Sequence, residues 1–237
     1  MAFENRRTVS GLAASQADID VGLRKHMLRV YNYMTSGLLL TGIVAYMVAG
    51  SPTMLQAIFG TPLMWVVMLA PFGFIMVLSF GINKLSFSAS QLLFWLFAAV
   101  MGLSMATIFI QFTGTSIARV FFITAGTFAG MSLYGYTTKT DLSRFGSFLI
   151  MGLIGIIIAS VVNMFMASSA LHFAISVIGV LVFVGLTAYD TQKIKEAYLE
   201  GDGTEVAGKK AIMGALSLYL DFVNLFMLLL HFFGDRR

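Results

Sequence analysis

The sequence contains no cysteine, only three prolines and few charged residues. The absence of cysteine excludes a disulfide framework, a thiolate metal site and a cysteine nucleophile. Charged residues make up 11% of the chain, whereas typical soluble domains carry roughly 25%. The net charge of +4 and the pI near 9.4 do not indicate a nucleic-acid partner, because the basic residues flank apolar runs and form no continuous patch.

Hydrophobic residues make up 58% of the chain and gather in long runs. A membrane-spanning helix needs about 20 mostly apolar residues. We therefore expect an all-α membrane protein in the lipid bilayer, whose seven transmembrane helices are 29–49, 61–82, 88–110, 117–136, 146–167, 172–192 and 210–233. These helices form one domain, residues 27–237. Residues 1–26 are polar and lack the apolar segment of a cleavable signal peptide, so we expect a polar cytoplasmic tail.

The basic residues predict the orientation of the helices. With the N-terminus in the cytoplasm, the inner segments hold Arg6, Arg7, Arg24, Lys25, Arg29, Lys84, Lys139, Arg144, Lys193, Lys195, Lys209 and Lys210. The outer segments then hold only Arg119, Arg236 and Arg237. Cytoplasmic loops are typically enriched in Lys and Arg, so this imbalance favours a cytoplasmic N-terminus and an outer C-terminus.

Small residues recur inside the apolar runs. Gly126 and Gly130 stand four apart in "GTFAG" and are followed by Gly135, and Gly152 and Gly155 stand in "GLIG". Small residues let transmembrane helices approach closely. We expect these glycines to serve packing between helices.

Two carboxylates lie where the chain is otherwise apolar. Asp221 is in the middle of the last run, in "LYLDFVNLF", and an ionised carboxylate there is costly unless it is paired or hydrated. Ser217, Asp221 and Asn224 share one helical face, so they predict a polar stripe that faces protein or water. Asp190 ends the sixth run in "LTAYDTQKIK", and Thr187 is on its face.

The sixth and seventh helices are expected to be antiparallel, so Asp190 and Asp221 meet if Asp190 lies about two turns before the helix end. Two carboxylates in contact cannot both ionise easily, and such a pair shares a proton. A hard divalent cation could replace that proton. The pair is therefore a candidate pH sensor and cation-binding site, with Thr187, Ser217 and Asn224 as candidate pore-lining residues. The alternative is that both acids only form hydrogen bonds within the bundle.

Lys84 lies between the second and third runs, on the same inner side as Asp190. It is a candidate latch that pairs with the acids and holds a pore shut. The alternative role is an ordinary basic anchor at the membrane surface.

Three stretches carry a resemblance to a known family. "GVLVFVGLTAYDTQKIK", "MSLYGYTTKTDLSRFG" and "GALSLYLDFVNLFMLLLHFFG" resemble the bacterial branch of the Bax inhibitor-1 family, and the likeness runs from about residue 25 to the C-terminus. The resemblance implies seven helices with the last one central, and a calcium leak that depends on pH. It also implies that Asp190 and Asp221 are the pH sensor. Some members latch the pair with an arginine, for which Lys84 is the nearest counterpart without the bidentate fork.

Several other functions were weighed. An intramembrane aspartyl protease needs Gly-x-Gly-Asp at its second acid and a later Pro-Ala-Leu, whereas this chain has "YLD" and no proline after Pro71. We therefore expect no enzyme and no resident cofactor, with calcium as the transported or transiently bound ion. A non-conducting regulator of another membrane protein, such as a membrane-anchored protease, stays open as the alternative, as does a proton-coupled transporter. The resemblance and the basic inner loops favour the bacterial inner membrane.

Overall fold

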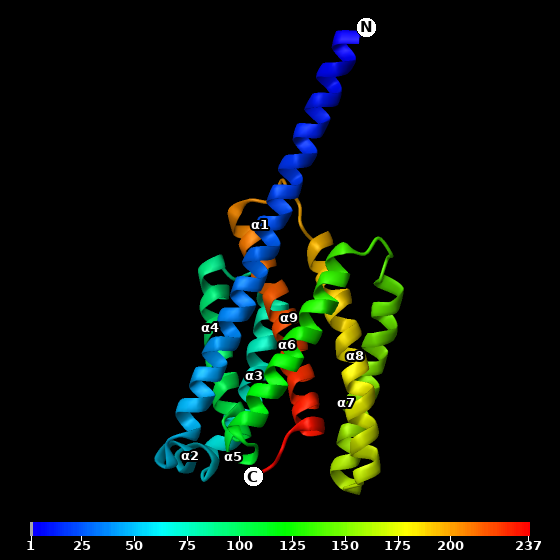
Figure 1. Cartoon of the computed structure of the whole chain (residues 1–237). Coiled ribbons are helices and arrows are strands. Elements are labelled where there is room, and N and C mark those ends of the chain that lie inside the picture. The colour runs from blue at the N-terminus through cyan, green and yellow to red at the C-terminus, as the bar shows by residue number, and fades with distance from the viewer. Residues whose placement is uncertain (1) are drawn as a thin grey trace.

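A computed structural model describes residues 2–237, with side chains from residue 21 onward. The described chain is helical throughout its length (Figure 1), and its helices are α1 (Ala2–Ala49), α2 (Pro52–Phe59), α3 (Leu63–Gly81), α4 (Phe87–Met105), α5 (Ile108–Gln111), α6 (Gly114–Thr137), α7 (Ser143–Met166), α8 (Ser169–Glu196) and α9 (Thr204–Phe233).

Seven segments of the described chain are long and apolar enough to cross a bilayer. They are Val21–Ala49, Leu63–Gly81, Phe87–Gln111, Gly114–Thr137, Ser143–Met166, Ser169–Glu196 and Thr204–Phe233. Each overlaps one of the predicted runs, which confirms the all-α membrane fold. The third segment combines α4 and α5, and the short helix α2 joins the first two segments.

The predicted boundary at residue 26 falls inside α1, because this helix runs without a break from Ala2 to Ala49. The polar side chains of residues 1–20, on which the prediction of a tail mainly rests, lie outside the described residues.

Helix starts are fixed by side-chain caps beside the apolar segments. The hydroxyls of Ser51, Ser86, Thr113 and Ser168 each accept a backbone N–H three residues later, at the starts of α2, α4, α6 and α8. Such caps satisfy N–H groups that have no partner within the helix. In the loop before α7, the Ser143 N–H donates to Asp141 Oδ1 at 2.8 Å, so Asp141 supplies an acceptor for the first residue of that helix.

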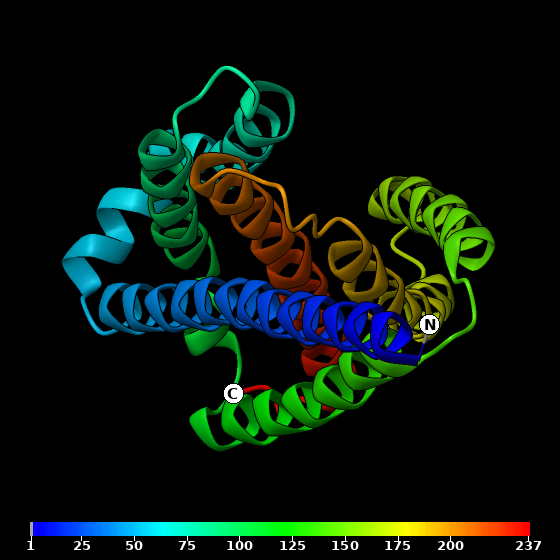
Figure 2. The same cartoon turned by 90° about the horizontal axis from the view of Figure 1, so that it is seen from above.

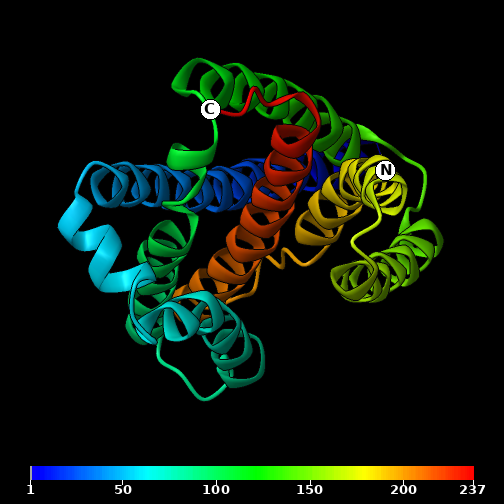
Figure 3. The ribbon, with the colours of Figure 1, turned by 90° about the horizontal axis from the view of Figure 1, so that it is seen from below.

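The last helix, α9, lies among the other helices (Figures 2 and 3) and buries most of its apolar side chains. It packs mainly against α1, α4, α6 and α8, whereas α3 packs on α4 and α7 packs on α8. The bundle is therefore layered, with α3 and α7 outside the helices that contact α9.

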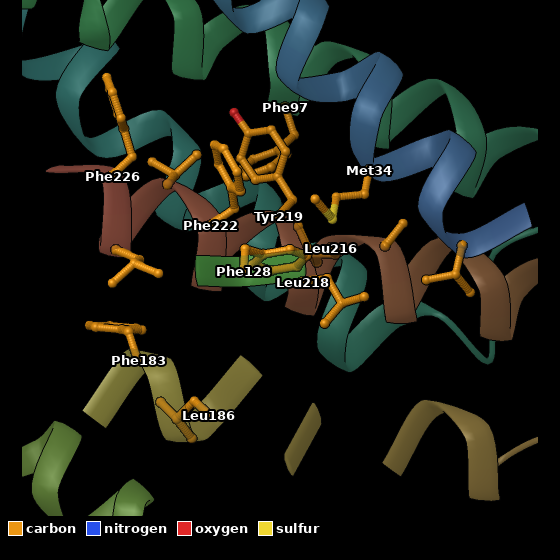
Figure 4. Close-up of a cluster of buried hydrophobic side chains, with 14 of the residues drawn as sticks. Met34, Phe97, Phe128, Phe183, Leu186, Leu216, Leu218, Tyr219, Phe222 and Phe226 are labelled. Atoms are coloured by element: carbon orange, nitrogen blue, oxygen red, sulfur yellow. The ribbon is translucent and has the colours of Figure 1, made fainter. Parts of the chain in front are cut away.

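Aromatic side chains of α9 form the centre of the core (Figure 4). Tyr219 is fully buried, and its ring meets Phe97 of α4 at 5.1 Å between centroids. The Tyr219 hydroxyl lies 2.6 Å from Thr41 Oγ1, which in turn donates to the Ala98 carbonyl at 2.8 Å. This contact joins α1, α4 and α9 and satisfies a hydroxyl that would be costly to bury alone.

The alternation of the spans places the starts of α1, α4, α7 and α9 at one end of the bundle. That end carries most of the basic residues from residue 21 onward, namely Arg24, Lys25, Arg29, Lys84, Lys139, Arg144, Lys193, Lys195, Lys209 and Lys210. We refer to it as the basic end. At the opposite end the C-terminal segment is tied to the α5–α6 junction, because the Thr113 N–H donates to the Asp235 carbonyl and the Arg237 N–H to the Gln111 carbonyl.

The predicted role of the small residues is only partly correct. A Cβ atom on Gly126, Gly130 or Gly155 would meet no atom within 4 Å, so these glycines serve no close packing inside the bundle. Gly152 does approach the Val182 side chain. The prediction is correct for Gly135, where α6 makes its tightest approach and a Cβ would collide with the backbone carbonyl of Ala188 on α8.

Candidate acid-pair site

The α8–α9 hairpin positions the two buried acids. Residues 197–203 join the helices, which run antiparallel with glycines at their contacts. A Cβ on Gly179 would lie 2.8 Å from Leu228 Cδ1, and a Cβ on Gly214 would lie 3.1 Å from Ile194 Cγ1. The two glycines therefore let α8 and α9 approach closely on either side of the acids.

The carboxyl groups of Asp190 and Asp221 lie within hydrogen-bonding reach of each other across this interface. Asp190 lies six residues before the end of α8 at Glu196, which is about 9 Å along the helix. The predicted contact is therefore present, since α8 continues as a helix past the end of its apolar run.

Asp221 is the more enclosed of the two acids. Its exposed fraction is 5%, and no N–H or O–H group among the described residues donates to its Oδ2. Two ionised carboxylates about 4 Å apart repel each other by roughly 4 kcal/mol at the effective dielectric of a protein. The contact between the two carboxyls is therefore unfavourable while both are ionised.

Lys193 follows Asp190 by three residues on α8, so the two lie on neighbouring positions of one helical face. Lys193 is exposed, and its Nζ lies over the Tyr189 ring, 5.9 Å from the centroid. Lys84 is exposed in the α3–α4 turn and makes no salt bridge to either acid within the described part of the chain. A Lys84 latch is thus absent from this conformation. The sequence did not single out Lys193 as a neighbour of the acid pair, because it resembles any other basic residue at a helix end.

The candidate pore-lining residues differ in their surroundings. Thr187 is fully buried and donates to the Phe183 carbonyl of its own helix, so it faces no open path here. Ser217 is half-buried, and Asn224 is exposed with its side-chain amide donating to the Leu220 carbonyl. Ser217 and Asn224 thus belong to the strip of α9 that its neighbours leave uncovered, whereas Thr187 does not.

Thr191, the residue after Asp190, connects three helices through hydroxyl groups. Thr191 Oγ1 donates to the Thr187 carbonyl at 2.7 Å and lies 3.0 Å from Ser132 Oγ of α6. Ser132 Oγ in turn lies 2.5 Å from the Tyr31 hydroxyl of α1. The backbone that carries Asp190 is therefore held by both α1 and α6.

Gln192 fastens the same segment to the α6–α7 loop. Its Oε1 accepts the Leu142 N–H at 2.8 Å, and its Nε2 donates to the Thr140 carbonyl at 2.9 Å. Sequence reasoning gave neither Thr191 nor Gln192 a role, although both lie inside the "AYDTQ" motif. Thr191 and Gln192 therefore tie the segment that carries Asp190 to α6 and to the α6–α7 loop.

No group of three or more His, Cys, Asp or Glu side chains gathers among residues 21–237. Ca²⁺ takes six to eight oxygen ligands. Asp190 and Asp221 together offer four carboxylate oxygens, so a cation at the pair would need water or backbone carbonyls to complete its coordination.

Comparison with known proteins decides the family. The family model described as inhibitor of apoptosis-promoting Bax1 matches residues 23–237, which include both acids and all but the first two residues of the seven membrane segments. The chain belongs to the Bax inhibitor-1 family. The resemblance seen in the three motifs is thereby confirmed.

Bacterial relatives match the chain over nearly its whole length. The inner membrane protein YbhL of Escherichia coli is 49% identical over 219 residues, covering 91% of this chain and 94% of YbhL. A protein of Rickettsia prowazekii is 48% identical and covers 92% of both chains. A protein of Caulobacter vibrioides is 43% identical over 98% of both chains. The chain is therefore similar to whole Bax inhibitor-1 family proteins of bacteria.

Proposed function

We propose that this protein is a proton-sensitive leak path for calcium, gated by the Asp190–Asp221 pair. The observation that carries the proposal is the buried contact between the two carboxyls, with Asp221 Oδ2 lacking a donor among the described residues. Intramembrane acids are costly and typically mark ion or proton pathways. A purely structural role would be filled at lower cost by two neutral residues.

The shared proton links pH to helix packing. While the pair holds a proton, the carboxyls attract each other and hold α8 against α9. When the proton leaves, the repulsion of roughly 4 kcal/mol acts directly on the α8–α9 interface. Gain or loss of one proton therefore changes the force between the helices, and Lys193 tunes that force through its charge on Asp190.

A calcium ion on the leak path would bind transiently to the carboxylate oxygens of Asp190 and Asp221. The strip of α9 with Ser217 and Asn224 supplies polar groups along one approach to the pair. The partial ligand set favours transient binding over a resident metal, because a stable site needs more oxygens than the pair offers. The proposal includes no covalent step, so we assign no enzymatic activity and no cofactor.

The proposed location is the bacterial inner membrane, the compartment named for the relative YbhL. The excess of basic residues at the basic end favours a cytoplasmic location for that end, and hence a cytoplasmic N-terminus. Asp190, about 9 Å from the end of α8, would then lie closer to the cytoplasm than to the outer surface.

The test is calcium flux into dye-loaded liposomes that contain the purified protein, scanned around neutrality from about pH 6 to pH 8. Asp190→Asn and Asp221→Asn are compared with the parent, and Asp141→Asn serves as the control because Asp141 is an exposed loop acid. We expect a pH-dependent flux in the parent and in the control, and flux without that dependence in the two pair variants.

Absence of flux above empty liposomes at every pH would reject the leak. A non-conducting regulator of a membrane protein would then be the better assignment. Such a regulator would keep its effect on its partner in the Asp190→Asn and Asp221→Asn variants, and lose it when residues 1–20 are removed.

A further inference from the structure

A long groove lies between α1 and α6, on the side of the bundle away from α3 and α7 (Figures 1 and 2). Its volume is about 1210 Å³, and Phe222 of α9 forms part of its floor. Small residues widen it, because Gly42 lines the α1 wall and Ala125 and Ala129 line the α6 wall. A Cβ on Gly42 would meet no atom within 4 Å, so the groove is open there.

The chemistry of the groove changes along its length. Most of the lining is apolar, and Arg24 is its single charged residue from residue 21 onward. Arg24 is exposed at the basic end, where the hydroxyls of Tyr31 and Ser132 join α1 to α6. Toward the other end the lining is formed by side chains such as Ile43 and Phe122, which are 55% and 73% exposed.

We propose that this groove binds a phospholipid with an anionic headgroup. The headgroup phosphate lies at Arg24, and an acyl chain extends along the groove toward Phe222. Charge complementarity supports this occupant, because a guanidinium forms bidentate hydrogen bonds with a phosphate. The apolar wall of the groove also supports a lipid. The groove is open to the bilayer, so an acyl chain can enter it directly from the surrounding hydrocarbon.

The chemistry of the groove favours lipid over a partner helix. Its lining is largely apolar except at the basic end, where Arg24 is the one charged lining residue from residue 21 onward, and this order matches the acyl chain and headgroup of a phospholipid. A flexible acyl chain also reaches the floor at Phe222 without the fixed width of about 10 Å that a helix requires. The proposal does not depend on whether the acid pair conducts calcium.

Lipid binding is measured by native mass spectrometry of the full-length protein in detergent, titrated with phosphatidylglycerol or with phosphatidylcholine of the same chains. Gly42→Phe fills the groove. Gly126→Phe is its matched control, because Gly126 also has no neighbour within 4 Å but lies on α6 outside the groove lining. Circular dichroism and size-exclusion chromatography check that both variants are folded and monodisperse.

We expect the parent and Gly126→Phe to retain phosphatidylglycerol, and Gly42→Phe to lose most of it. Arg24→Gln is expected to lower the preference for phosphatidylglycerol over phosphatidylcholine about fivefold, as for one basic residue at a membrane surface. Lys25→Gln is the control, because Lys25 is exposed beside Arg24 but does not line this groove.

Three results would overturn the proposal. Equal retention of phosphatidylglycerol by the parent and by Gly42→Phe would show that the lipid binds elsewhere. Equal affinity of the parent for the two lipids would remove the role of Arg24. A change in oligomeric mass on Gly42→Phe, with lipid retention unchanged, would assign the groove to a second copy of the chain.

Discussion

The closest approach between α6 and α8 allows a sharp test of the packing around the acid pair. In the variant Gly135→Ala, the new Cβ meets the Ala188 carbonyl oxygen, which is backbone and cannot rotate away. The helices must separate, and overpacking of this kind costs typically 1–3 kcal/mol. Separation also weakens the 3.0 Å contact between Ser132 and Thr191, which adds about 0.6 kcal/mol at the average value for membrane proteins.

Opposing these losses, alanine is a better helix former than glycine by up to about 1 kcal/mol. The net expectation is a loss of about 2 kcal/mol in the free energy of unfolding, as the sum of these three effects. Gly126→Ala is the control, because its Cβ has open space and should leave stability unchanged or slightly raised.

Both variants are measured by reversible unfolding in mixed detergent and dodecyl sulfate micelles, followed by circular dichroism. An unfolding free energy of Gly135→Ala within 0.5 kcal/mol of the parent, about the range seen for substitutions without a packing effect, would refute the reasoning. It would mean that α6 moves away from α8 at negligible cost.

Three further outcomes follow from other contacts. Hydrogen bonds from the Ser143 hydroxyl and N–H lower the pKa of Asp141 below its usual 3.8. The Asp141 carboxylate therefore stabilises the start of α7 fully above pH 3.8, and this stabilisation disappears as the pH falls through the lowered pKa. Asp141→Asn should abolish this acid dependence, measured as amide exchange at the start of α7. Gln192→Ala removes the acceptor of the Leu142 N–H, and amide exchange in residues 138–142 should rise. Tyr219→Phe removes the contact with Thr41 and should lower the unfolding free energy by about 1 kcal/mol, because the Thr41 hydroxyl keeps its carbonyl acceptors.

Hydropathy predicted the number and order of the spans because a bilayer imposes one length and one polarity on every crossing helix. At the basic end it stopped the sixth span too early, at residue 192, and started the seventh too late, at residue 210, since α8 continues to Glu196 and α9 already begins at Thr204. The additional turns are polar, so a measure of apolar length does not detect them. These turns are nevertheless what lets Asp190 lie inside a helix and reach Asp221.

The acid pair was predictable because a carboxylate in an apolar run has few stable surroundings. Its neighbours were harder to predict. The sequence shows that a glycine is small but does not show which neighbour its face of the helix meets. Gly126 and Gly135 therefore look alike in sequence, although only Gly135 contacts another helix. The choice between Lys84 and Lys193 likewise depends on the direction in which each helix end points, which requires the packed structure.

The short α8–α9 connection, residues 197–203, also affects how the chain enters the membrane. A single aspartate in a lone helix costs about 3 kcal/mol at the centre of the membrane during insertion. Two adjacent helices that insert as a hairpin bring Asp190 and Asp221 together before either meets lipid, so one shared proton neutralises part of the charge of both. Because the hairpin follows α1, α4 and α6 in the chain, the surfaces of these helices that bind α9 are synthesised before the hairpin. We therefore expect lengthening of this loop to impair biogenesis more than it impairs the stability of the mature protein.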